Sequence, residues 1–276
     1  MKTSTQLKAL IRNLSQDKKV EAEIILRNYM MERLLERISL SAYKNSFILK
    51  GGMLIAAIVG IDTRTTMDLD ATVKGVALSE EKIVSMMKEI SGIRVDDDVA
   101  ITFRSIEAIH EEADYPGYRV SLDAVLDKTR QVLKVDITVG DFVTPREIEF
   151  RFQLMFEDRA INVMAYNMET VLAEKFETII TRGIANTRMR DFYDIYILTC
   201  TQQFDRSVFV AALENTTEKR DTVAQMRSPT TVIQSIASDP VMQEHWSRYQ
   251  KIYSYAADIS WDVAIEALHK LAVLSK

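Results

Sequence analysis

The chain has 276 residues, of which 47% are hydrophobic and 27% charged, the balance of a globular protein with one large or two ordinary domains. Cys200 is the only cysteine, which excludes a disulfide scaffold, and one cysteine with three scattered histidines also excludes a zinc finger. The sequence has neither a signal-peptide core nor an apolar run long enough to span a membrane, so we expect a cytoplasmic protein with no membrane partner.

The net charge is −5, from 35 Lys and Arg against 40 Asp and Glu. A negatively charged chain does not attract nucleic acid through its overall field. Any polyanion must therefore be held by local basic patches or through bound cations.

Hydrophobic periodicity predicts helices and one short strand in the first part of the chain. Apolar residues from Val20 to Ile38 recur at the helical spacing, with Glu and Arg on the other face. Gly51 and Gly52 permit a tight turn or a close approach of backbone. The elements predicted here are, in chain order, a helix over 5–40, a strand over 47–49, a buried helix over 53–59 and a polar loop over 61–66.

The pattern then changes to the alternation that is typical of strands. Over residues 67–73, apolar side chains alternate with Asp68 and Asp70, and over 132–140 they alternate in the same way with Asp136. The other elements predicted in this part are a helix over 79–90 with Ser79 as its N-cap, and strands over 99–106 and 117–125.

The remainder of the chain is predicted to be helical. Asn167 is a suitable N-cap for a helix that ends at Gly183, a good helix terminator. A short helix is expected over 190–200, and about four more over 203–276. We therefore predict an α+β protein, with strands and helices over 1–162 and a helical domain over 163–276.

Three aspartates on two of the predicted strands are the strongest candidates for chemistry. Asp68 and Asp70 are two residues apart on one strand, so their side chains point the same way from Cα atoms roughly 6.5–7 Å apart. If the strand of Asp136 lies beside them, the three carboxylates share a small volume, where like charges raise one another's pKa unless a cation is present. Mg²⁺ prefers carboxylate oxygens as ligands and also binds nucleotide phosphates. Two such ions can activate the attacking hydroxyl and stabilise the leaving oxygen. The alternative is that these aspartates form the solvated face of a sheet.

Lys50, Gly51 and Gly52 precede an apolar helix and form the second candidate site. Glycine lets backbone N–H groups approach phosphates, and a helix N-terminus favours anions. The same residues also suit an ordinary strand-to-helix turn. The order of turn, helix and D-x-D strand favours the phosphate site.

The third candidate lies on the two helices that follow Asn167. Lys175 is at the border of an apolar stripe, where it either holds triphosphate oxygens or only extends its amine to solvent. Arg190 belongs to one of the few basic clusters in this acidic chain. Asp191 and Asp194 share one helix face, and they either orient a substrate hydroxyl or an arginine, or cap and solvate the helix start.

Taken together, these motifs resemble the AbiEii/AbiGii nucleotidyltransferase toxin family, a branch of the DNA polymerase β-like nucleotidyltransferase superfamily. The matching blocks lie between about residues 47 and 198. They are FILKGGMLIAAIV…RTTMDLDATV, then LKVDITVGD, then ETVLAEKFETIITRGIANTRMRDFYDIYIL. The leading segment RNYMMERLLERIS is also similar to the N-terminal region of the family. The resemblance implies a mixed sheet flanked by helices, followed by a helical domain.

The resemblance also implies a role for each matching residue. The expected metal ligands, for two Mg²⁺ ions, are Asp68, Asp70 and Asp136. The expected nucleotide-binding residues are Lys50, Gly51, Gly52, Lys175, Arg190 and Asp194. Catalysis is expected to use Asp68, Asp70, Asp136, Lys175 and Asp191, with Asp191 completing the acceptor site. One departure is Gly52, which stands where the wider superfamily commonly has serine, so one phosphate contact is lost while backbone donors remain.

Members of this family are usually toxins encoded beside a winged-helix antitoxin, and some relatives add nucleotides to the 3′ end of tRNA. The resemblance therefore implies an enzyme that transfers NMP from an NTP to an RNA, with tRNA as the expected acceptor, and so blocks translation and growth. Two alternatives stay open. In the first, the acceptor is not RNA but a small molecule, such as an aminoglycoside, or a protein hydroxyl. In the second, the chain is a non-catalytic binding module whose carboxylates are surface charges.

Overall fold

The computed structural model describes residues 4–75, 79–110 and 116–275. The chain divides into two compact units: unit 1 comprises Met1–Asp141 and Glu147–Ala165, and unit 2 comprises Phe142–Arg146 and Tyr166–Lys276. The chain passes from unit 1 to unit 2 for the last time after Ala165.

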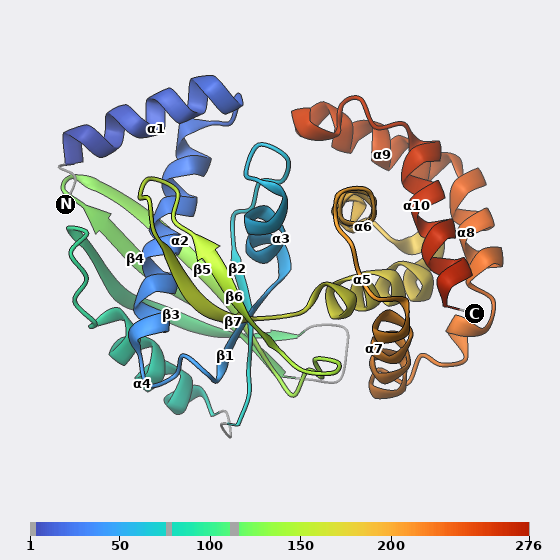
Figure 1. The fold of residues 1–276 in the computed structure, drawn as a ribbon, viewed down its shortest axis with the longest axis horizontal. Helices are drawn as coiled ribbons and strands as arrows, with labels where there is room; N and C mark the ends of the chain where they lie inside the picture. Colours follow the sequence, from blue (N-terminus) through green and yellow to red (C-terminus); the bar gives the residue numbers. More distant parts are fainter. Residues whose placement is uncertain (1–3, 76–78, 111–115, 276) are drawn as a thin grey trace. The chain divides into compact units, whose positions relative to one another are not determined.

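Unit 1 is built on a seven-stranded mixed sheet with the order β3-β4-β5-β2-β1-β7-β6 (Figure 1). In chain order the strands are β1 (Phe47–Lys50), β2 (Leu69–Val73), β3 (Val99–His110), β4 (Pro116–Leu126), β5 (Thr129–Val139), β6 (Ile148–Gln153) and β7 (Ala160–Ala165). The central pairs β2–β5 and β1–β7 are parallel, whereas β1–β2 and the outer pairs are antiparallel. The predicted α+β class, with a mixed sheet, is confirmed.

Strands β6 and β7 are absent from the prediction, which places no strand after residue 140. Each has only six residues, so the alternation is short. β6 is an edge strand, and its charged side chains Glu149 and Arg151, on either side of Phe150, are exposed. A segment of this length is weak evidence for a strand without the neighbour that pairs with it.

Four helices accompany the sheet: α1 (Ser4–Lys18), α2 (Ala22–Leu40), α3 (Gly51–Val59) and α4 (Glu80–Ser91). The single helix predicted over 5–40 is wrong, because the chain breaks at Lys19, which has a φ of +53°. Such a left-handed conformation cannot continue an α-helix. α2 contacts β3, β5 and β7 and therefore crosses the sheet. Ser79 accepts a hydrogen bond from the Lys82 N–H and caps α4, as predicted.

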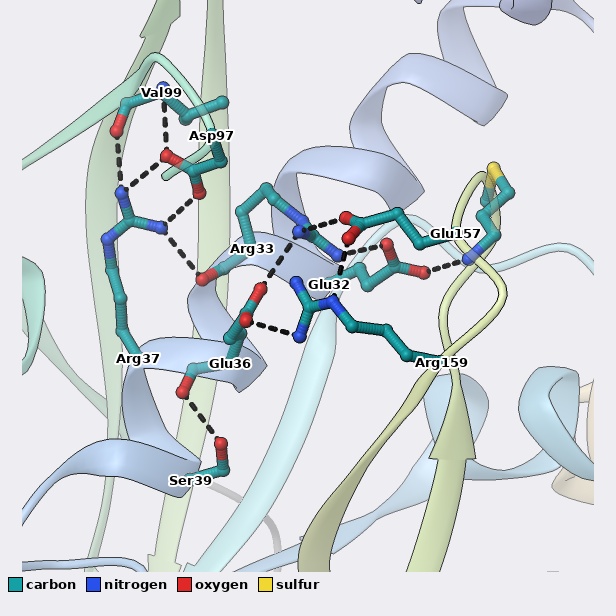
Figure 2. A network of polar contacts seen from close by, with 10 residues as sticks. Glu32, Arg33, Glu36, Arg37, Ser39, Asp97, Val99, Glu157 and Arg159 are labelled. Carbon is teal, nitrogen blue, oxygen red and sulfur yellow. Dashed lines mark hydrogen bonds and ion pairs between the residues drawn. The ribbon is translucent and has the colours of Figure 1, made fainter. Parts of the chain in front are cut away.

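The polar face of α2 is buried in a network of charges (Figure 2). Arg33, which is 1% exposed, donates to Glu36 and to Glu157 at 2.8 Å each. One turn further, Arg37 holds Asp97 through bonds of 2.7 and 3.0 Å. The network fastens the loop before β3 and the β6–β7 turn to α2, so the Glu and Arg face predicted from periodicity has a structural role.

Unit 2 contains six α-helices in the part of the chain that the structure describes. They are α5 (Met168–Arg182), α6 (Met189–Thr201), α7 (Arg206–Lys219), α8 (Pro229–Ser238), α9 (Pro240–Ile252) and α10 (Trp261–Leu274). As predicted, Asn167 caps α5 by accepting from the Thr170 N–H, and the helix ends at Gly183, whose φ is +53°. Asn167 also donates to the Thr144 carbonyl at 2.6 Å, which ties the segment 142–146 to this unit.

Among the described helices, none combines the length and the hydropathy needed to cross a bilayer.

Candidate functional site

Asp70 and Asp136 face each other as register partners on the adjacent parallel strands β2 and β5. The adjacency on which the predicted carboxylate cluster depends is therefore present. Asp68 precedes β2 by one residue. Its charge, like that of Asp136, raises the pKa of Asp70.

The half-buried Asp70 lies beside the turn at Gly51. Burial raises the pKa of its carboxyl, and the nearby charges of Lys50 and the Gly52 N–H lower it, but the net shift is upward. The Gly52 N–H donates to Asp70 Oδ2 over 3.2 Å. An ionised Asp70 is thus held in a costly environment that a bound cation would improve.

Gly51 is required at its position for two reasons. Its φ is +64°, a left-handed conformation that residues with a side chain rarely adopt. A Cβ atom on Gly51 would also lie 2.0 Å from Asp70 Oδ2. The turn therefore brings bare backbone against the Asp70 carboxylate.

Lys50 lies opposite Asp70 in the β1–β2 register and forms an ion pair with Asp141 at 2.7 Å. Thr138 donates to the same Asp141 oxygen over 2.6 Å. Asp141 is absent from the predicted site, although it belongs to the LKVDITVGD block. Its position places a further carboxylate near the Lys50 end of the sheet.

Arg119 on β4 is the second residue that the sequence analysis misses. Its guanidinium donates from Nε to Asp136 Oδ1 and from Nη2 to Asp136 Oδ2, both over 2.7 Å. The hydrogen bond to Asp136 raises the pKa of Arg119. A bidentate pair of this kind is a strong interaction, and both oxygens of Asp136 are used by it.

The donor set fits Mg²⁺ in chemistry, because it consists of carboxylate oxygens on two neighbouring strands. Within the described ranges, however, no three His, Cys, Asp or Glu side chains are arranged so that they could hold a metal ion directly. For Asp136 the reason is Arg119, whose guanidinium occupies both carboxylate oxygens. Asp136 could therefore bind a metal ion only after Arg119 has released at least one of its oxygens.

A second cluster lies within unit 2, where Lys175 on α5 faces α6. The Lys175 amine contacts Asp191 at 2.6 Å and Asp194 at 2.8 Å, and the Asp194 side chain is fully buried. Burial lowers the pKa of Lys175, but the two aspartates outweigh it, and the net shift is upward. Lys175 is therefore a charged and largely enclosed group, 15% exposed, rather than one extended to solvent.

Arg190 lies on α6 next to this cluster. Its guanidinium donates to the Tyr253 hydroxyl over 2.6 Å and lies 5.0 Å from the centre of that ring. The predicted site residues thus form two groups. Lys50, Gly51, Gly52, Asp68, Asp70 and Asp136 belong to unit 1, and Lys175, Arg190, Asp191 and Asp194 belong to unit 2.

Comparisons with known proteins agree with this architecture. The model of the family described as nucleotidyl transferase AbiEii toxin, type IV TA system, matches residues 33–267. No curated protein matches the chain. Among solved structures, the nucleotidyltransferase toxin MenT4 from Mycobacterium tuberculosis aligns with a TM-score of 0.55 at 16% identity, covering 98% of this chain and 99% of that one. JHP933 from Helicobacter pylori aligns with a TM-score of 0.50 at 12% identity, covering 92% of this chain and 91% of that one.

The structural likenesses show a shared fold, while the family match shows the class of enzyme. That match covers most of the chain, including both clusters of candidate residues, and decides against the non-catalytic binding module. NTP is the substrate, and an antitoxin the partner, that this family implies. The chain belongs to the AbiEii family of nucleotidyltransferase toxins of type IV toxin–antitoxin systems.

Proposed function

We propose that the protein transfers NMP from an NTP to the 3′ end of an RNA, with tRNA as the acceptor and Mg²⁺ as the required cation. The observation that carries the proposal is the pairing of Asp70 with Asp136 on adjacent strands beside the glycine turn. When bound, Mg²⁺ neutralises the developing charge on the phosphates and activates the attacking hydroxyl.

In this reaction the acceptor hydroxyl oxygen forms a bond to the α-phosphorus, and the bond from the α-phosphorus to the bridging oxygen breaks, releasing pyrophosphate. Asp68, Asp70 and Asp136 are assigned to binding of the cation. Once Arg119 has moved away from Asp136, that carboxylate is assigned the role of the base that accepts the proton of the acceptor hydroxyl. The turn at Gly51 presents backbone beside Asp70, where phosphate oxygens are expected to lie.

Lys175 is assigned a phosphate contact. Its amine is charged and already held by two carboxylates, so it is oriented before any nucleotide arrives. Asp191 is assigned to the site that binds the acceptor. The reaction uses NTPs and RNA, so we place it in the cytoplasm, where blocked translation stops growth. A winged-helix antitoxin encoded nearby is the expected partner.

The proposal is tested by incubating the protein with Mg²⁺, tRNA and each NTP, labelled in turn at the α- and the γ-phosphate. Transfer of NMP predicts label in RNA from the α-phosphate only. Asp136→Asn is expected to lower the rate by at least about a hundredfold, as loss of a catalytic acid–base group does. Asp123→Asn is the matched control, because Asp123 is also a strand carboxylate held by an arginine, Arg130, through two bonds.

No labelled RNA with any NTP contradicts the RNA acceptor. Label found instead on a protein or a small molecule, identified by mass spectrometry, favours the alternative acceptors. Equal labelling by Asp136→Asn and Asp123→Asn contradicts the assignment of the site.

A further inference from the structure

A cavity of about 450 Å³ lies within unit 2, between the start of α6 and the second half of α9. Its volume is in the range of sites that take one small organic ligand or a nucleotide. The lining combines positive and aromatic side chains in an acidic protein. The side chains of interest are Arg188, Arg190, His245, Arg248, Tyr249 and Tyr253.

The aromatic part of the lining is held firmly. The ring of Tyr253 lies 4.7 Å from that of Tyr249 and stacks on Tyr255 at 5.4 Å. Arg190 lies over the Tyr253 ring and bonds its hydroxyl. A guanidinium fixed on an aromatic ring provides a flat platform of the kind on which proteins stack unpaired bases.

The cations around this platform are available to a ligand. Arg188 is exposed, and among the described residues its guanidinium has no ion-pair partner. Arg248 pairs with Glu244 one turn away on the same helix, and both side chains are about two-thirds exposed. Exposed pairs of this kind contribute little, so a phosphate displaces the glutamate at small cost.

The lining contains one carboxylate, Asp191, which shares the Lys175 amine with Asp194. A cavity with a stacking platform and uncommitted cations matches a base attached to a phosphate chain. Because the whole chain carries a charge of −5, an RNA has to be recognised at a local patch, and this cavity is such a patch.

We propose that the cavity binds the 3′-terminal nucleotide of a single-stranded RNA end, with its base on the Arg190–Tyr253 platform and its backbone phosphates at Arg188 and Arg248. The inference rests on the proposed function, since it assigns a place to the acceptor. Asp191, which the sequence assigns to the acceptor, borders the same cavity.

The test measures binding of the full chain to a fluorescent RNA of about ten nucleotides with a free 3′ hydroxyl, without NTP or divalent cation. Arg188→Ser and Arg248→Ser are each expected to raise Kd about fivefold or more, and to lower the dependence of log K on log salt by about one. Tyr253→Leu is expected to raise Kd at least about fivefold through lost stacking. Circular dichroism and thermal unfolding establish that each variant is folded.

Two controls are matched to these variants. Arg227→Ser removes an exposed arginine elsewhere in unit 2, and Lys270→Ala breaks an exposed ion pair with Glu266 of the same spacing as Arg248–Glu244. Both are expected to stay within about twofold of the wild-type Kd. A 4-thiouridine at the 3′ end is expected to crosslink within residues 187–191 or 245–253.

A wild-type chain that binds no RNA, cavity variants that bind RNA as the controls do, or a crosslink elsewhere overturns the proposal. If the cavity variants weaken binding of an NTP with Mg²⁺ and leave RNA binding unchanged, the cavity takes the donor nucleotide and the proposal is wrong. Failure of the proposed function gives a different result from failure of the cavity proposal. Selective RNA binding without NMP transfer supports the cavity and contradicts the reaction, whereas RNA labelling with an unchanged KM in Arg188→Ser and Arg248→Ser contradicts the cavity alone.

Discussion

Arg119 binds both carboxylate oxygens of Asp136, the residue that stands opposite Asp70 in the central sheet. The guanidinium therefore neutralises one carboxylate of the candidate metal site. Asp70 has no comparable ion pair at hydrogen-bond distance among the described contacts, and its carboxyl accepts from the Gly52 N–H. The site is thus composed of one carboxylate that is already compensated and one whose ionisation is opposed by burial.

Arg119→Gln is expected to tighten binding of a divalent cation about tenfold, because a charge-assisted bidentate pair no longer competes for Asp136. The measurement is calorimetric titration with Mn²⁺ or Mg²⁺ in the absence of NTP. Arg130→Gln removes the equivalent pair with Asp123 and is expected to leave cation affinity unchanged. Weaker cation binding in Arg119→Gln would contradict the idea that Arg119 competes with the metal.

Gly51→Ala is expected to abolish RNA labelling and cation binding, since its Cβ would displace the Asp70 carboxylate. Gly75→Ala is the matched control. Gly75 also has a positive φ, of +76°, but nothing lies within 4 Å of the position of its Cβ. Both variants carry backbone strain of roughly 1–2 kcal/mol, measured by urea unfolding, and only Gly51→Ala should lose activity. Equal activity in the two variants would show that the Gly51–Asp70 contact is not needed.

Lys175→Met is expected to lower the free energy of unfolding by about 3–5 kcal/mol, because it leaves the fully buried carboxylate of Asp194 without its cation. Adding Asp194→Asn to Lys175→Met should recover part of that loss, since the amide carries no charge. Urea unfolding of the single and double variants measures both the loss of unfolding free energy and its recovery. If the double variant folds well but labels no RNA, the Lys175–Asp194 pair has a role in the reaction in addition to its structural one. A loss below about 1 kcal/mol in Lys175→Met would mean that the pair is not a buried one.

The buried network on α2 predicts a dependence of stability on pH. Burial raises the pKa of Glu32 from 4.5 to about 7 in the folded chain. Between these values the unfolded chain loses the proton while the folded chain keeps it, so this group's contribution to stability falls as pH rises. The difference in unfolding free energy between wild type and Glu32→Gln should therefore shift by about 3 kcal/mol against the wild type from pH 4.5 to pH 8.

Glu23→Gln is the control on the same helix, because Glu23 is 65% exposed and pairs only one turn away with Arg27. The change with pH for Glu32→Gln is measured against the change for this variant. A difference that rises with pH for Glu32→Gln would mean that Arg33 and the Met155 N–H outweigh burial and stabilise the ionised carboxylate.

Local signals in the sequence are sufficient for several parts of the fold. The caps at Asn167 and Ser79 and the terminator Gly183 act within one helical turn, so their effect is visible from neighbouring residues. The alternation around Asp70 likewise places it on the face opposite to Leu69.

Other features depend on partners that are distant in sequence. The pairing of β2 with β5 depends on a parallel register across the whole β3–β4 hairpin, which periodicity does not determine. Arg119 reaches Asp136 only because the antiparallel β4–β5 register sets them side by side. The arginines of α2 pair with Asp97 and Glu157, which lie far along the chain. The helical pattern does not contain these partners, so by itself it indicates that the charged face is solvated.

We propose that the carboxylates of Asp70 on β2 and Asp136 on β5 hold the divalent cation of the reaction. The most direct measurement is the anomalous scattering of Mn²⁺ in crystals of the wild-type chain grown with Mn²⁺ and an NTP analogue that cannot be cleaved at the α-phosphate. We expect a peak bound by Asp70, with Asp136 released from Arg119 on at least one oxygen. A fully occupied Mn²⁺ site elsewhere, with the Arg119–Asp136 pair intact and the analogue's phosphates away from the Gly51 turn, would contradict it.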